Sequence, residues 1–230
     1  LGAIPAPFGR YAVLGNHDLW ADDRHIVRRL EAAGITMLTN RNTRLPAPFD
    51  DVWLCGLDEP LFGEPNAHAA LAGANGTRIV LMHSPDGLFS LEGERFDLAL
   101  CGHTHGGQVT LPNGAAILVP AGKLSRRYAH GEHGVGANGD AWLLVSRGVG
   151  CTTLPIRLGA SPEVHLIVVA RVYRRPVSRF PFPVSRFPFP VPPLHVACSR
   201  LHVCRVYTAC MFCNLPLGAN EIVEVFPVGR

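Results

Sequence analysis

Short apolar runs recur along the first 170 residues, and polar, Gly-containing turns follow several of them. The runs that we interpret as strands lie at 11–14, 35–38, 52–58, 78–82, 96–101, 116–119, 142–145 and 164–169. Runs of this length, bounded by turn residues, are typical of buried strands. Their alternation with helical segments predicts an α/β layered domain whose chemistry lies at strand ends.

Helical spacing separates some of these runs. The residues that indicate the first helix are a cap at Asp22 or Asp23, an apolar stripe of Ile26, Val27 and Leu30, and a stop at Gly34. We expect a second helix at 66–71 and a helical turn beginning at Pro85. The segment 40–51 is polar and Pro-rich, and it reads as a connection.

The last sixty residues have a different character, so we divide the chain into a domain at 1–169 and a tail at 170–230. Within the tail, Val177–Pro183 recurs without change as Val184–Pro190. A Pro-rich tandem copy cannot form a helix or a central strand. We therefore expect the tail to be a disordered or extended linker, or an aberrant segment read in an altered frame.

Charge divides the chain at the same place. After residue 170, eight arginines and two glutamates give +6, whereas the preceding 170 residues carry 13 basic and 16 acidic side chains, or −3. The overall +3 is too small to indicate a nucleic-acid-binding protein. No signal peptide opens the chain, and the apolar run 164–172 is too short to span a bilayer.

The seven cysteines do not form a disulfide framework, so nothing in their pattern requires an oxidising compartment. Cys55, Cys101 and Cys151 are scattered and read as small buried thiols. In the tail, Cys210 and Cys213 have a spacing that suits zinc. Five residues separate Cys198 from Cys204, which is too many for the other half of such a site.

Histidine-containing turns follow three of the predicted strands. Gly15-Asn16-His17-Asp18 follows the strand at 11–14, Met82-His83-Ser84-Pro85-Asp86 ends the strand at 78–82, and Gly102-His103-Thr104-His105-Gly106-Gly107 follows the strand at 96–101. Each motif alone could be an ordinary turn. Together, imidazole, amide and carboxylate groups at neighbouring strand ends indicate a metal site.

This arrangement resembles the calcineurin-like metallophosphoesterase superfamily. The matching elements are its Gly-Asn-His-Asp/Glu element at 15–18, its lone strand-end histidine at His83 and its Gly-His-x-His element at 102–105. A closer resemblance is to the bacterial membrane-associated phosphodiesterase branch, carried by 11–20, 81–86, 102–109, 145–150 and 157–164. The likeness covers residues 1–169. It implies a layered α/β sandwich of mixed β-sheets flanked by helices, with its N-terminal part missing here.

The resemblance also implies a role for each motif residue. Asn16, His83 and His103 would hold one metal ion, and His105 would help to hold a second. His17 would protonate or hydrogen-bond the leaving oxygen, and Asp18 would fix the orientation of its ring. The family site holds two divalent ions (Mn, Fe or Zn), which neutralise a phosphodiester and supply a bound hydroxide.

Two further elements of the superfamily, Asp-x-His and Gly-Asp-(x)n-Asp, would precede Gly15. Residues 1–14 contain no Asp, Glu or His. We therefore expect the 230 residues to hold at most one ion well and to have little or no hydrolase activity. A non-catalytic alternative is a metal-binding module or a defective fragment with a misread tail.

The partner that the resemblance implies is a phosphoester substrate, whose identity the motifs do not specify. We expect no specific nucleic-acid partner, because the basic tail has only charge in its favour. The branch implies membrane association through a segment that would precede Leu1. It places the protein in the cytoplasm or at a membrane of a bacterium.

Overall fold

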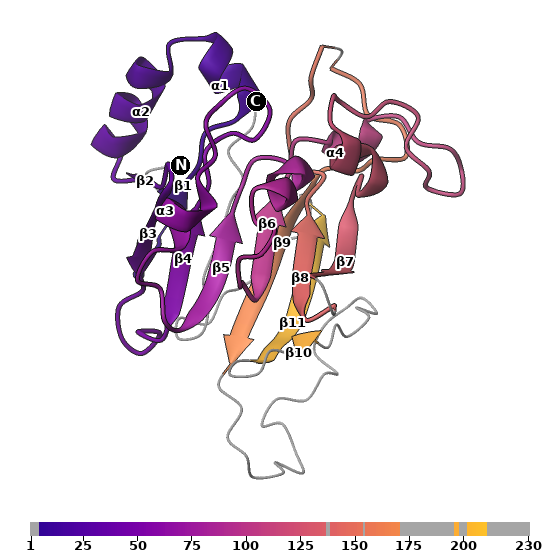
Figure 1. The fold of residues 1–230 in the computed structure, drawn as a ribbon. Helices are drawn as coiled ribbons and strands as arrows, with labels where there is room; N and C mark the ends of the chain where they lie inside the picture. Colours follow the sequence, from indigo (N-terminus) through magenta and orange to yellow (C-terminus); the bar gives the residue numbers. More distant parts are fainter. Residues whose placement is uncertain (1–4, 137–138, 154, 171–195, 198–201, 211–230) are drawn as a thin grey trace.

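Parallel strands form the centre of the fold, and their carboxyl ends meet at one edge, at the top of Figure 1. The computed structural model describes residues 5–136, 139–153, 155–170, 196–197 and 202–210. Its strands are β1 (Tyr11–Ala12), β2 (Thr36–Met37), β3 (Arg41–Arg44), β4 (Val52–Gly56), β5 (Thr77–Leu81), β6 (Leu98–Cys101), β7 (Gly131–Val135), β8 (Ala141–Val145), β9 (Glu163–Ala170), β10 (Val196–Ala197) and β11 (His202–Cys210). Its helices are α1 (Asn16–Trp20), α2 (Asp23–Ala32), α3 (Ala67–Leu71) and α4 (Lys123–Arg127), with 3-10 turns η1 (Pro85–Phe89) and η2 (His105–Gly107).

The largest sheet has six strands in the order β3-β4-β5-β6-β8-β7. Strands β4, β5, β6 and β8 pair in parallel, and the edge strands β3 and β7 are antiparallel to their neighbours. The central strands are buried almost throughout, as in the run Leu98–Cys101. Burial on both faces explains why these strands read as continuous apolar runs.

A second β layer lies behind the six-stranded sheet in Figure 1. It contains the parallel pair β1-β2 and the antiparallel sheet β10-β11-β9. Ile167 and Val169 of β9 pack with Leu98, Leu100 and Leu144 of the large sheet in one apolar cluster. The burial of leucine and isoleucine side chains between the two layers stabilises this arrangement.

Helices cover the outer faces of both layers. Ile26, Val27 and Leu30 of α2 pack on the apolar side chains of β1 and β2, as the sequence predicted, and Asp22 caps the helix through the N–H of His25 at 2.9 Å. On the far side of the large sheet, the buried cluster includes residues of α3. The architecture is therefore the predicted α/β sandwich of mixed sheets flanked by helices.

One predicted strand is absent, and two edge strands lie where no element was predicted. Residues 116–119 form no strand, because Ile117 and Leu118 are exposed and only Ala116 makes a bridge, to Thr110. The polar stretch 40–51 contains β3, and the Gly-rich stretch 131–139 contains β7. Both are edge strands that pair through the backbone, so neither shows the apolar pattern of a buried strand.

The predicted tail is described only in part. Strand β11 pairs with β9 from Glu163 to Ala170, and β10 pairs with β11. The repeats at 177–190, Cys198 and Cys213 lie outside the described residues, so the division at 169/170 stays a prediction. Among the described residues, no helix has the length and apolar character needed to cross a bilayer.

Candidate metal centre

A pocket of about 460 Å³ opens at the edge where the carboxyl ends of the parallel strands meet. The six predicted site residues all line it: Asn16, His17, Asp18, His83, His103 and His105. The turn after β1 contributes the first three, the end of β5 contributes His83, and the loop after β6 contributes the last two. Residues that are far apart in sequence thus converge because their strands are neighbours in the fold.

Three side chains make the tightest contact in the pocket. Nε2 of His83 lies 2.8 Å from Oδ1 of Asn16 and 3.0 Å from Nδ1 of His103. Nε2 of His103 lies 3.2 Å from the carbonyl oxygen of Ala121. A carbonyl only accepts, so the hydrogen of a neutral His103 ring is on Nε2 and its Nδ1 lone pair faces the other two residues.

This trio tests whether the residues fit a bound cation. A hydrogen on His83 Nε2 can be donated to Asn16 Oδ1 or to His103 Nδ1, but not to both. In the contact left without it, two atoms face each other with lone pairs and no hydrogen between them. A cation shared by all three atoms would satisfy every lone pair. Donors bound at about 2.1 Å and at right angles stand about 3 Å apart, which matches the observed spacing. The donor set therefore fits a divalent ion.

The trio includes an amide as one of its three donors. In residues 5–136, 139–153 and 155–170, no group of three His, Cys, Asp or Glu side chains could hold a metal ion. The oxygen of Asn16 supplies what such a group lacks. Amide and imidazole together suit Mn²⁺, Fe²⁺ or Zn²⁺.

Burial sets the protonation of these histidines. Desolvation, reinforced by His103, His105 and His17 nearby, lowers the pKa of His83 to about 3. Burial also lowers the pKa of His103 and of His105, and the charge of Arg157 lowers the pKa of His105 further. Rings with lowered pKa values are neutral at pH 7, and neutral imidazole is the form that binds metal ions.

The Ala121 carbonyl is held in place by a contact that the sequence motifs did not reveal. Asp86, which is buried, accepts from the N–H of Leu124 at 3.1 Å and from the N–H and hydroxyl of Ser125 at 3.0 and 2.7 Å. Its carboxylate thus anchors the first turn of α4 on η1. The segment before α4 then places Ala121 against His103.

His17 and Asp18 do not interact as predicted. Oδ2 of Asp18 accepts from the N–H of Gly15 at 2.8 Å, and the His17 ring instead contacts Thr152 Oγ1 at 3.4 Å and the ring of Trp20 at 4.8 Å between centroids. The short turn Gly15–Asp18 explains this, because it directs the carboxylate back to its own backbone. Asp18 therefore stabilises the turn that presents Asn16 and His17.

The mouth of the pocket is apolar, which the sequence motifs did not indicate. Trp20, Phe62 and Leu118 line it with 60, 53 and 62% of their surfaces exposed. The rings of Trp20 and Phe62 are 5.2 Å apart in an edge-to-face arrangement. A ligand with an apolar group could bury that group against these side chains.

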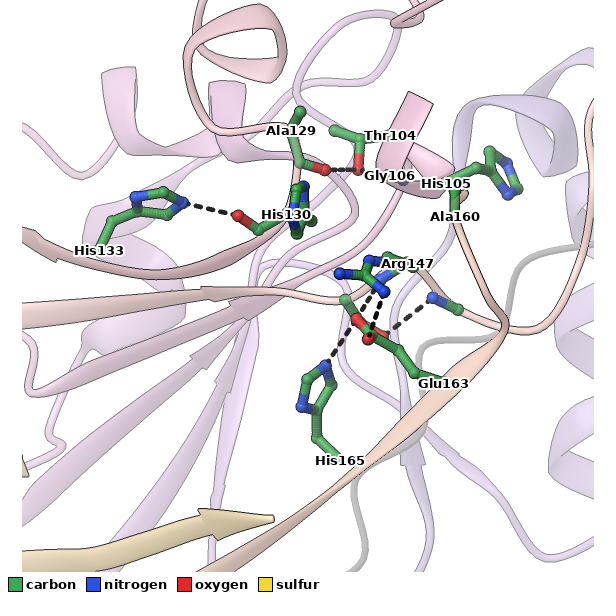
Figure 2. Close-up of polar contacts among 12 residues, drawn as sticks. Thr104, His105, Gly106, Ala129, His130, His133, Arg147, Ala160, Glu163 and His165 are labelled. Atoms are coloured by element: carbon green, nitrogen blue, oxygen red, sulfur yellow. Dashed lines mark hydrogen bonds and ion pairs between the residues drawn. The ribbon is translucent and has the colours of Figure 1, made fainter. Parts of the chain in front are cut away.

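A largely buried ionic cluster joins the segment after β8 to β9 (Figure 2). Glu163 accepts from the N–H of Arg147 at 2.8 Å, lies 3.7 Å from its guanidinium, and contacts His165 Nε2 at 3.1 Å. The side chains of Glu163 and His165 are 7 and 8% exposed, so both are largely buried. Burial alone would raise the pKa of Glu163, but these hydrogen bonds and charges lower it.

The histidines of β7 and the turn before it lie outside the pocket lining. His133 Nε2 is 3.0 Å from the carbonyl of His130, as Figure 2 shows, and its ring packs on Tyr128. Neither residue is among those that line the 460 Å³ pocket.

Comparisons with known proteins found relatives in bacteria. The chain is 33% identical over 169 residues to the uncharacterized metallophosphoesterase YkuE of Bacillus subtilis, covering 71% of this chain and 57% of the relative. It is 34% identical over 160 residues to the phosphodiesterase YaeI of Escherichia coli, covering 68 and 57%. It is 33% identical over 172 residues to the uncharacterized metallophosphoesterase YkoQ of Bacillus subtilis, covering 71 and 61%.

The chain thus spans somewhat more than half the length of these three relatives. No family model matches the chain. No solved structure matches it either.

Proposed function

The chain belongs to the calcineurin-like metallophosphoesterase superfamily, and we propose that the protein is a metal-dependent phosphodiesterase whose reaction takes place in the 460 Å³ pocket. The observation that carries this proposal is the convergence of Asn16 and His103 on Nε2 of His83 within 3.0 Å. A relative of comparable similarity is named a phosphodiesterase.

Asn16, His83 and His103 are the residues that would hold an ion. When bound there, a divalent ion neutralises phosphate charge and lowers the pKa of water toward neutrality. The residues of the chain have separate tasks. The carbonyl of Ala121 keeps the hydrogen of His103 on Nε2, and the buried wall around His83 keeps its imidazole unprotonated.

His17 is the proposed proton donor to the leaving oxygen. Its ring lines the pocket, where it contacts Thr152 and Trp20, and this position puts it close to a bound ligand. Thr152 Oγ1, 3.4 Å from Nε2, can orient the ring. Histidine is the commonest general acid because its ordinary pKa is near neutrality.

The second ion of the family site has little support from these residues. His105 is the remaining imidazole of the pocket, and Asp18 is the single carboxylate among the described lining residues. That carboxylate is hydrogen-bonded to the N–H of Gly15. We therefore propose that the 230 residues hold one ion and turn substrate over weakly, since a bridging carboxylate is needed to hold two cations close together.

Two measurements test the proposal. The first is binding of phenylphosphonate to the Mn²⁺-loaded chain by isothermal titration calorimetry, which we expect to detect and which should require the metal. The second is hydrolysis of bis-p-nitrophenyl phosphate with Mn²⁺, which should be slow and should disappear in His17→Ala. Absence of phosphonate binding would refute the site, and rapid turnover would refute the single-ion account.

A further inference from the structure

The loop that carries His105 has a backbone conformation that needs external support. His105 and Gln108 have φ values of 51 and 48°, and Gly106 and Gly107 between them have 61 and 80°. The left-handed region costs a non-glycine residue about 1 kcal/mol or more. Such a run persists only where neighbouring groups hold it.

Arg157 provides this support by joining three segments of backbone. Its guanidinium donates to the carbonyl of His105 at 3.3 Å, to that of Arg147 at 2.8 Å and to that of Ala160 at 3.1 Å. Its Nε–H donates to the carbonyl of Gly150 at 3.0 Å, and a terminal N–H contacts the same oxygen. The planar fork of an arginine suits this task, because its donors have fixed relative directions.

The carbonyl of Gly150 also determines where His105 carries its hydrogen. Nδ1 of His105 lies 3.2 Å from this oxygen. Because a carbonyl cannot donate, the hydrogen of the neutral ring is on Nδ1, and the lone pair is on Nε2. Nη2 of Arg157 also comes within 3.4 Å of Nδ1, but its two hydrogens are already donated to the carbonyls of Arg147 and Gly150, so it has none left for His105. The guanidinium and the imidazole lie close together because both donate to the carbonyl of Gly150.

We propose that Arg157 is a positioning residue that sets the tautomer and orientation of His105 by fixing the carbonyl of Gly150. What His105 does in the pocket rests on the proposed function, whereas the tautomer itself does not. Without Arg157, the Gly150 carbonyl and the strained His105 backbone both lose their anchor. The ring hydrogen then redistributes between Nδ1 and Nε2, and the lone pair no longer has a fixed direction.

The direct test is long-range ¹H–¹⁵N NMR of the full chain labelled with ¹⁵N-histidine. The measurement is made about two pH units above the usual histidine pKa of about 6.5, where the rings are neutral. The His105 signals are assigned with His105→Gln. In the wild type we expect Nδ1 to have the shift of a protonated nitrogen and Nε2 that of an unprotonated one. In Arg157→Gln both shifts should move toward the mean.

Two further variants serve as a control and as a conservative replacement. Arg44→Gln removes another guanidinium, which contacts the carbonyl and carboxylate of Asp50, and it should leave the His105 spectrum unchanged. Arg157→Lys retains a cation with fewer fixed donors, and it should give intermediate shifts even if Arg157→Gln does not fold. A second readout is Mn²⁺ affinity. We expect it to stay unchanged in Arg157→Gln, because the single ion of the proposed function is held by residues other than His105.

The outcomes distinguish the positioning role of Arg157 from the proposed metal chemistry. An unchanged His105 spectrum in folded Arg157→Gln or in Arg157→Lys would overturn the positioning role. A shifted spectrum in a chain that binds no Mn²⁺ would support the positioning role and refute the proposed metal chemistry. A shifted spectrum with Mn²⁺ binding of wild-type strength supports both. Weakened Mn²⁺ binding would place His105 among the ligands of the ion and refute its assignment to Asn16, His83 and His103 alone.

Discussion

Nε2 of His83 lies 2.8 Å from Oδ1 of Asn16, although 67 positions separate the two residues in the chain. The contact exists because the turn after β1 and the end of β5 meet at the same edge of the fold. Burial lowers the pKa of His83 to about 3, so this contact has no charge to stabilise it at pH 7. Two groups with lone pairs are thus held together in the pocket, which is the arrangement that a cation would complete.

The conformation of Gly106 gives a prediction about the loop at 102–107, which carries His103 and His105. Its φ is 61°, and a Cβ at this position would lie 2.7 Å from Cγ of Arg147. Gly106→Ala should therefore destabilise the chain by about 1–2 kcal/mol from backbone strain, plus a contribution from the clash. The measurement is the midpoint of urea unfolding.

Gly114→Ala is the matched control for this substitution. Gly114 has a φ of 83°, and a Cβ there would meet nothing within 4 Å. It should show the backbone strain alone, so Gly106→Ala should be the more destabilising of the two. Equal effects would mean that Arg147 does not pack over Gly106.

The sequence predicted which histidine-containing turns meet better than it predicted what surrounds them. Strand-end motifs located Asn16, His83 and His103, because parallel strands bring their carboxyl ends together whatever connects them. Apolar runs also identified the buried strands. These signals are local, and each depends on a few adjacent residues.

The features that escaped prediction depend on contacts between distant parts of the chain. Nothing in the local sequence marks the role of Arg157, around which the fold places four carbonyls. Glu163 and His165 read as an ordinary strand until β9 buries them. The edge strand β7 has no apolar alternation, since its pairing with β8 uses only backbone groups.

Glu163 makes stability depend on pH. Its pKa is lowered in the folded chain, so its hydrogen bonds to Arg147 and His165 contribute stability above the unfolded pKa of about 4.3. This contribution is lost as pH falls below that value, through the folded pKa. Glu163→Gln should cost about 1–3 kcal/mol at pH 7, because it removes a buried charged acceptor.

Urea unfolding of the wild type and Glu163→Gln at pH 7 and at pH 3 tests this expectation. The difference in unfolding free energy between the two proteins should be smaller at pH 3. A difference that is independent of pH would show that Glu163 acts through packing and not through its charge.

Buried thiols should be protected from alkylation. Burial raises the pKa of Cys55 to about 12 and raises the pKa of Cys101 well above its usual range. The reactive thiolate is therefore scarce in both up to pH 9. Cys151 is partly exposed, and peptide mass spectrometry after iodoacetamide treatment should find it modified before the other two. Prior modification of Cys55 in the folded chain would contradict its burial.

Trp20 gives a prediction about ligand affinity. Its indole lines the pocket mouth beside His17, so it can contact an aromatic group on a phosphoester. Aromatic contacts of this kind contribute about 0.5–1.5 kcal/mol, and Trp20→Ala should weaken phenylphosphonate binding by about 2- to 12-fold. Methylphosphonate binding should change little.

Phe89→Ala is the control for Trp20→Ala. Phe89 is also a largely exposed aromatic residue, but it is not among those that line the 460 Å³ pocket. Its removal should leave phenylphosphonate affinity unchanged. The same loss in both variants would show that the effect is not specific to the pocket mouth.

The central claim is that Asn16, His83 and His103 hold one divalent ion. The most direct measurement is Mn²⁺ binding to the full chain by isothermal titration calorimetry, because thiolates in the tail have little preference for Mn²⁺. His83→Ala removes the central donor, and His68→Ala, whose side chain is 93% exposed, serves as the control. We expect one Mn²⁺ per chain in the wild type and in His68→Ala, with affinity reduced more than about tenfold in His83→Ala. Undetectable binding in the wild type, or equal affinity in His83→Ala, would contradict the account.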